Sequence, residues 1–103
     1  MKLSVVAALG LAALAHGATF KACYKANYEG QCDETTSGKL VTHTYPYKSY
    51  VWKSSRNKCV RICDSCKNLG YRCDDYSNNS IQFNKAIIFD WKGGKGPDLT
   101  TCC

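Results

Sequence analysis

Eight cysteines in a chain of 103 residues constrain the fold more than any other feature of the sequence. They all follow an N-terminal segment in which a positive start, Met1–Lys2, precedes an apolar run, Leu3–Leu14, and then small residues. This order is typical of a secretory signal peptide, and the run is shorter than the ~20 residues of a membrane span. We therefore predict that residues 1–18 are a cleaved signal peptide and that the mature protein is secreted. Three cleavage positions fit the pattern, after Ala15, Gly17 or Ala18.

An even number of cysteines in a short secreted chain indicates a disulfide framework. We predict one domain, residues 19–103, in which four disulfide bonds supplement a modest hydrophobic core. Each bond can contribute roughly 2–4 kcal/mol to stability, so reduction is expected to unfold the protein. The predicted disulfide cysteines are Cys23, Cys32, Cys59, Cys63, Cys66, Cys73, Cys102 and Cys103.

The pairing of these cysteines stays open, because eight cysteines allow about 105 connectivities. Adjacent cysteines rarely bond to each other, so Cys102 and Cys103 are expected to bond to cysteines far away in the sequence. The spacing of Cys63 and Cys66 is also that of zinc ligands. Disulfides are the stronger interpretation in a secreted chain, and we expect neither a metal nor a cofactor.

The stretch 55–73 predicts the central element of the fold. Cys59, Cys63 and Cys66 lie at offsets that share one face of an α-helix, and charged residues occupy many of the other positions. A serine before the pattern and a glycine after it fit the two helix caps. We therefore expect one main helix, at about residues 55–69, with its cysteines directed inward.

Residues on both sides of this stretch predict β-strands. Segments 39–53 and 81–91 are rich in β-branched and aromatic residues, and apolar residues alternate in segment 19–30. Segment 32–38 is polar and rich in turn formers, which predicts a loop. Strands before and after one helix predict an α+β fold, in which a small antiparallel sheet carries the helix on one face.

The sequence lacks the combination of groups that catalysis requires. His43 is the one histidine clearly inside the predicted mature chain, and nucleophilic catalysis needs an oriented base beside a nucleophile. Asp74 and Asp75 are adjacent, which on a strand would direct them to opposite faces, whereas acid–base catalysis needs paired carboxyl groups. We therefore predict that the protein is not an enzyme.

One enzyme class nevertheless resembles part of the sequence. The segment His43–Lys48, HTYPYK, is similar to the histidine near a Tyr-Pro segment in small secreted fungal guanyl-specific ribonucleases. Lys85–Phe89 is similar to their basic residue followed by a hydrophobic strand. The second histidine that these enzymes use as general acid is missing after Phe89. This resemblance implies an inactive relative that binds RNA.

Four aromatic side chains between residues 45 and 52 are interleaved with Lys48 and Lys53. Such a pattern can form a platform on which sugar rings or bases stack, although packing within a half-buried sheet explains it more often. The candidate ligand-binding residues are Tyr45, Tyr47, Tyr50 and Trp52.

Two further features concern the surface. Asn78 begins the N-glycosylation pattern Asn-Asn-Ser in a predicted turn. Lysine and arginine outnumber acidic residues by 14 to 8, for a net charge of +6. This charge favours solubility and mild attraction to anionic surfaces, but it lacks the arginine clusters of a nucleic-acid-binding protein, and we expect no binding to DNA.

The signal-like segment MKLSVVAALGLAALAHG, the short basic chain, the eight cysteines and the terminal Cys102–Cys103 form a recognisable layout. This layout resembles the small cysteine-rich secreted proteins of plant-pathogenic ascomycete fungi, such as the biotrophy-associated secreted proteins of blast fungi. The resemblance implies a monomeric, virulence-associated effector that binds a host target without catalysis. It would act in the host apoplast, at the host–pathogen interface or after entry into host cells.

The resemblance leaves the partner open between a host protein and a cell-wall or membrane component, with carbohydrate as an alternative. The predicted order of helix and sheet is also similar to the killer-toxin-like α/β proteins. That second resemblance implies a secreted toxin or antimicrobial protein as the alternative function. A carbohydrate- or RNA-binding module that uses the Tyr45–Trp52 aromatic residues is the third.

Overall fold

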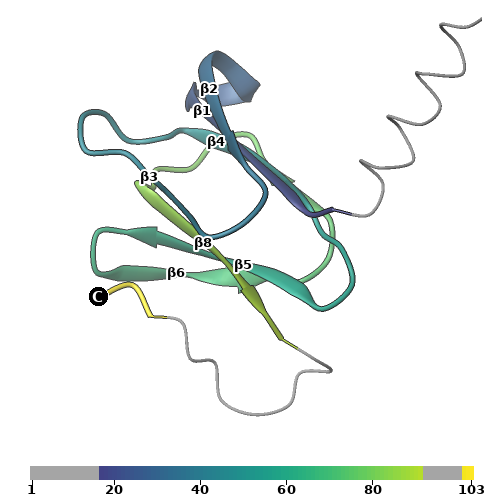
Figure 1. Cartoon of the computed structure of the whole chain (residues 1–103). Helices are drawn as coiled ribbons and strands as arrows, with labels where there is room; N and C mark the ends of the chain where they lie inside the picture. Colours follow the sequence, from purple (N-terminus) through teal and green to yellow (C-terminus); the bar gives the residue numbers. More distant parts are fainter. Residues whose placement is uncertain (1–16, 92–100) are drawn as a thin grey trace, which may run out of the picture.

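The computed structural model describes residues 17–91 and 101–103, and within them the chain is almost entirely β-structure (Figure 1). The 3₁₀ turn η1 (Ala26–Tyr28) joins the first two strands. The strands are β1 (Thr19–Lys25), β2 (Glu29–Thr35), β3 (Lys39–Val41), β4 (Ser49–Lys53), β5 (Lys58–Asp64), β6 (Lys67–Arg72), β7 (Tyr76–Asn78) and β8 (Lys85–Asp90).

These strands form two four-stranded antiparallel sheets. One sheet has the order β2-β1-β4-β7 and the other the order β3-β8-β5-β6. Residues from both sheets share one hydrophobic core, to which Phe20 and Trp52 contribute from the first sheet and Val60 and Ile88 from the second. The two sheets therefore pack face to face around this core, with β1 and β4 above β5 and β8 in Figure 1.

The predicted main helix at residues 55–69 is wrong, because this stretch forms β5, a tight turn and β6. Cys59 and Cys63 are four residues apart, and a spacing of four places two residues on one face of a strand as well as on one face of a helix. The β-branched residues Val60 and Ile62 occupy the alternate positions and are buried in the core. Such residues favour strands, and the fold is all-β rather than α+β.

The turn of this hairpin explains the remaining helix signals. Asp64 pairs with Lys67, and between them Ser65 adopts a φ of 56°. Cys66 therefore belongs to the turn and not to a helical face. Gly70, which fitted a helix end, lies within β6 with a φ of 107°, a conformation that glycine adopts readily.

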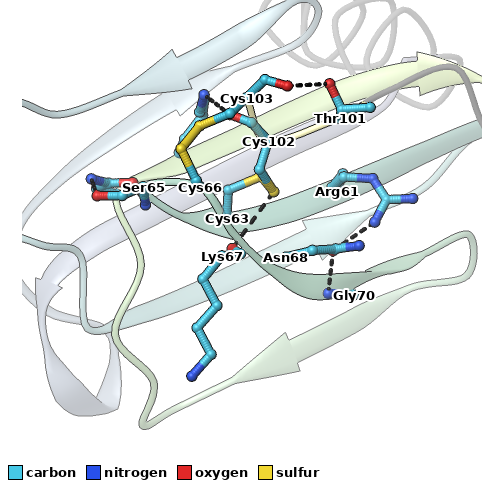
Figure 2. The surroundings of a disulfide bond; sticks show 12 residues. Arg61, Cys63, Ser65, Cys66, Lys67, Asn68, Gly70, Thr101, Cys102 and Cys103 are labelled. Atoms are coloured by element: carbon cyan, nitrogen blue, oxygen red, sulfur yellow. Dashed lines mark hydrogen bonds between the residues drawn. A yellow bond between two sulfur atoms is a disulfide. The ribbon is translucent and has the colours of Figure 1, made fainter.

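The structure contains four disulfide bonds, which confirms the prediction of a disulfide-rich chain. Three of them lie at the second sheet, where two attach the C-terminal residues to the β5–β6 hairpin (Figure 2). Such bonds are typical of oxidising compartments. The pairs are Cys23–Cys32, Cys59–Cys73, Cys63–Cys102 and Cys66–Cys103.

The predicted signal peptide lies outside the described residues except for Gly17 and Ala18. Within the described part of the chain, no helix has the length and apolar character needed to span a membrane.

Candidate functional site

Three of the four candidate ligand-binding residues lie in the core. The exposed fractions of Tyr47, Tyr50 and Trp52 are 1%, 3% and 0%. Phe83 packs against the first two, with ring centroids 5.2 Å from Tyr47 and 5.5 Å from Tyr50. Tyr45, in contrast, is 74% exposed. The four side chains therefore do not form one platform, and packing explains the pattern for three of them.

Tyr45 borders a polar cleft instead. The cleft has a volume of about 310 Å³ and lies where three segments meet: the loop between β3 and β4, the end of β5 and the approach to β8. This volume is near the lower end of the ~300–1,000 Å³ range of small-molecule sites. The lining residues are Thr42–Pro46, Asp64, Gln82 and Asn84.

Thr42 fixes the wall of the cleft that carries Tyr45. Thr42 is only 7% exposed, and its Oγ1 donates a hydrogen bond to the carbonyl oxygen of Tyr45 at 3.1 Å. The backbone N–H of Thr44 donates to the same Oγ1 at 3.5 Å, and the Tyr24 hydroxyl lies 3.2 Å from it. A buried residue therefore holds the loop in which His43 and Tyr45 are exposed.

Behind this wall, one oxygen of Asp33 accepts hydrogen bonds from two tyrosines. The hydroxyls of Tyr47 and Tyr24 donate to Asp33 Oδ2 at 2.8 Å and 3.0 Å. Burial, assisted by the bond to Asp33, raises the pKa of Tyr47 above its ordinary value. The phenol therefore stays protonated and remains a donor at neutral pH.

Asn84 joins the other two segments of the cleft. Its backbone N–H donates to the carbonyl of Cys63 at 3.0 Å, and its own carbonyl accepts from the Thr42 N–H at 3.0 Å. The side-chain Oδ1 accepts from the Ser65 N–H at 2.8 Å. Asp64 lies between Cys63 and Ser65, so these bonds fix its position in the cleft.

Two disulfide bonds support the same end of the molecule. Cys63 bonds to Cys102 on one side of Asp64, and Cys66 bonds to Cys103 on the other (Figure 2). These bonds also remove the thiolates that the zinc interpretation of Cys63 and Cys66 required. Within residues 17–91 and 101–103, no group of three or more His, Cys, Asp or Glu side chains could hold a metal ion.

A second surface feature was not predicted from the sequence. Tyr71, Phe89 and Trp91 form an aromatic cluster at the second sheet, with ring centroids 4.9 Å apart for Tyr71 and Trp91 and 6.5 Å apart for Tyr71 and Phe89. The Arg61 guanidinium lies 5.3 Å from the Tyr71 ring centroid. The spacing of Phe89 and Trp91 indicated a shared face, but the contact with Tyr71 arises only from strand pairing.

Asn78 lies at the end of β7, where its Oδ1 accepts a hydrogen bond from the Ser80 N–H at 3.0 Å. The asparagine is partly exposed. Its glycosylation stays a prediction.

The chain matches no protein-family model, no curated protein and no solved structure.

Proposed function

We propose that the protein is a secreted effector of a plant-pathogenic fungus, which acts by binding a host molecule and not by catalysis. The observation that carries this proposal is the polar cleft, in which hydrogen bonds hold the lining residues Thr42 and Asn84. A preformed site loses less conformational entropy on binding than a flexible one. The signal-like N-terminus and the effector-like layout of the sequence support the secreted role.

The surroundings of His43 favour binding over catalysis. A catalytic histidine acts beside a nucleophile and is oriented by a third group. The His43 side chain is exposed at the cleft, and no described residue donates to its ring or accepts a hydrogen bond from it. The cleft offers hydrogen-bonding groups without such an oriented set, which suits recognition of a polar ligand.

Deletion of the gene in the producing fungus tests this proposal. We expect reduced colonisation of the host and full recovery with the wild-type gene. A version without residues 1–18 is the matched control, because it would be made but retained inside the fungal cell, and it should not restore colonisation. Unchanged colonisation after deletion, together with no host response to the purified protein, would overturn the proposal.

The killer-toxin-like fold is wrong, whereas the toxin or antimicrobial function that the resemblance implied stays a prediction. That resemblance implied a helix packed on a sheet, whereas the described residues form two packed sheets.

A further inference from the structure

We propose that the cleft between the 42–46 loop and Asp64 binds a neutral saccharide, such as the end of a cell-wall glycan. This inference rests on the proposed effector function and names the ligand class of its cleft. The volume of about 310 Å³ suits a small ligand or the terminal unit of a longer one. It is too small to enclose a folded partner.

Tyr45 supplies a stacking surface for a sugar ring. Its side chain is 74% exposed, and an aromatic ring offers an apolar face beside a polar hydroxyl. The C–H groups of a pyranose ring can pack on such a face. Thr42 Oγ1 already holds the Tyr45 carbonyl at 3.1 Å, so little backbone order has to be created when a ring docks.

Other polar groups of the cleft lining complement sugar hydroxyls. A hydroxyl can donate and accept, so sugar hydroxyls can bond both to a carboxylate and to an amide. Asp64 provides the carboxylate, which accepts hydrogen bonds when ionised. Gln82 Oε1 accepts from Lys48 Nζ at 3.4 Å, and this contact leaves the Gln82 amide N–H groups as donors.

The charge of the cleft distinguishes a saccharide from a nucleic acid. The whole chain carries a net charge of +6, and Lys48 Nζ contacts the lining residue Gln82. The described residues that line the cleft nevertheless include neither lysine nor arginine and do include Asp64. Nucleic-acid sites depend on basic side chains that neutralise phosphates. A carboxylate would repel a phosphate, so the lining favours an uncharged polyol over RNA.

The test is an NMR titration of the isotope-labelled protein, with all its disulfides intact. The probes are oligomers of chitin, β-1,3-glucan and cellulose, together with a single-stranded RNA oligonucleotide. We expect at least one glycan to shift the amide signals of the 42–46 loop, and the RNA to leave them unchanged. No glycan-dependent shift at millimolar probe, or RNA-dependent shifts in this loop, would overturn the inference.

Matched variants separate binding from folding. Tyr45→Ala and Asp64→Asn should each weaken glycan binding by about tenfold or more, while Tyr45→Phe should retain most of it because the ring stays. Tyr28→Ala and Asp74→Asn are controls, since both residues are exposed and lie outside the cleft lining, and they should bind like the wild type. Equal affinity of the cleft and control variants would contradict the inference.

The two proposals can fail independently. If no glycan binds but deletion of the gene reduces colonisation, the saccharide is the wrong ligand class and the effector function stands. If a glycan binds but deletion has no effect, the cleft assignment stands and the effector function is wrong.

Discussion

Asp33 lies at the centre of a polar network that two tyrosines reach from different segments. Tyr24 comes from β1 and Tyr47 from the segment before β4, and their ring centroids are 4.8 Å apart. Hydroxyls buried in this way stabilise the fold only while their partners are present, because a buried group without a partner keeps its desolvation cost. The Tyr24 hydroxyl also lies 3.2 Å from Thr42 Oγ1, so the network is adjacent to the cleft.

Replacement of Asp33, the acceptor that the two tyrosines share, should reveal this desolvation cost. We expect Asp33→Ala to lower the free energy of unfolding by roughly 1–3 kcal/mol, because the Tyr47 hydroxyl would lose its acceptor. Glu34→Ala is the matched control, since Glu34 is the exposed neighbour on β2, and its effect should be close to zero. Urea unfolding with the disulfides intact measures both, and equal stabilities would contradict the role of Asp33.

Alkaline titration tests the protonation of the buried tyrosines. Burial raises the pKa of both Tyr47 and Tyr50 above the ordinary value of 10.0. A pKa raised in the folded state means that the stabilisation is complete below pH 10 and is lost as the pH rises above it. We expect these two phenols to ionise only together with unfolding, as followed by phenolate absorbance and circular dichroism. Ionisation of every tyrosine with an unchanged circular dichroism spectrum would contradict this.

The β5–β6 hairpin shows where local sequence is ambiguous. The predicted strands at 39–53 and 81–91 contain β4 and β8, because their β-branched and aromatic residues favour no other element strongly. At 55–69 the spacing of Cys59 and Cys63 fits both a helix and a strand, and the alternation of the β-branched residues Val60 and Ile62 is the signal for a strand. The polar segment 32–38, predicted as a loop, belongs in part to β2, since pairing with β1 outweighs local composition.

The cleft could be predicted only in part, because its lining residues come from segments that are distant in the sequence. Tyr45 was a candidate from its sequence neighbourhood, and it is the one candidate aromatic residue at the cleft. Asp64, Gln82 and Asn84 carry no local signal. Strand pairing and the backbone bonds of Asn84 bring them together, and neither is encoded within a short window of sequence.

The two C-terminal disulfide bonds close nearly the same loop. Cys63–Cys102 spans 39 residues and Cys66–Cys103 spans 37. A loop of this length contributes about 4 kcal/mol in the chain-entropy model, but either bond alone keeps it closed. Their contributions should therefore be strongly non-additive.

A double-mutant cycle tests this redundancy. We expect Cys66→Ala/Cys103→Ala to cost little, because both cysteines are exposed, and Cys63→Ala/Cys102→Ala to cost more, because both are buried. Removal of all four cysteines should cost clearly more than the sum of the two pairs, by an amount that approaches about 4 kcal/mol. Additive losses in thermal or urea unfolding would show that the two bonds act independently.

At the scale of the whole molecule, the disulfide bonds and the hydrophobic core stabilise different parts of the fold. The bond Cys23–Cys32 lies within the first sheet and Cys59–Cys73 belongs to the second, while the other two attach the C-terminal residues to the second sheet. None of the four joins the two sheets to each other. The aromatic core between the sheets must supply that attraction, which is largely hydrophobic.

Replacement of Phe83 tests most clearly whether the hydrophobic core holds the two sheets together. Phe83 is fully buried, and its ring centroid lies within 5.2–6.0 Å of those of Tyr47, Tyr50 and Phe20. We expect Phe83→Ala to destabilise the protein by about 3–5 kcal/mol with all four disulfides formed. Phe89→Ala, a matched change at a partly exposed ring, should cost less. Similar thermal melting of the two variants would argue that the disulfides alone hold the molecule together.

The central claim is that the cleft carries the function, and complementation of the gene deletion with a cleft variant tests it most directly. The variant Tyr45→Ala/Asp64→Asn is compared with Tyr28→Ala/Asp74→Asn, after both have been shown to be secreted with four disulfides and unchanged melting. Our account predicts that the cleft variant fails to restore colonisation and that the control variant restores it fully. Full restoration by both would show that the protein acts through another surface and would contradict the account.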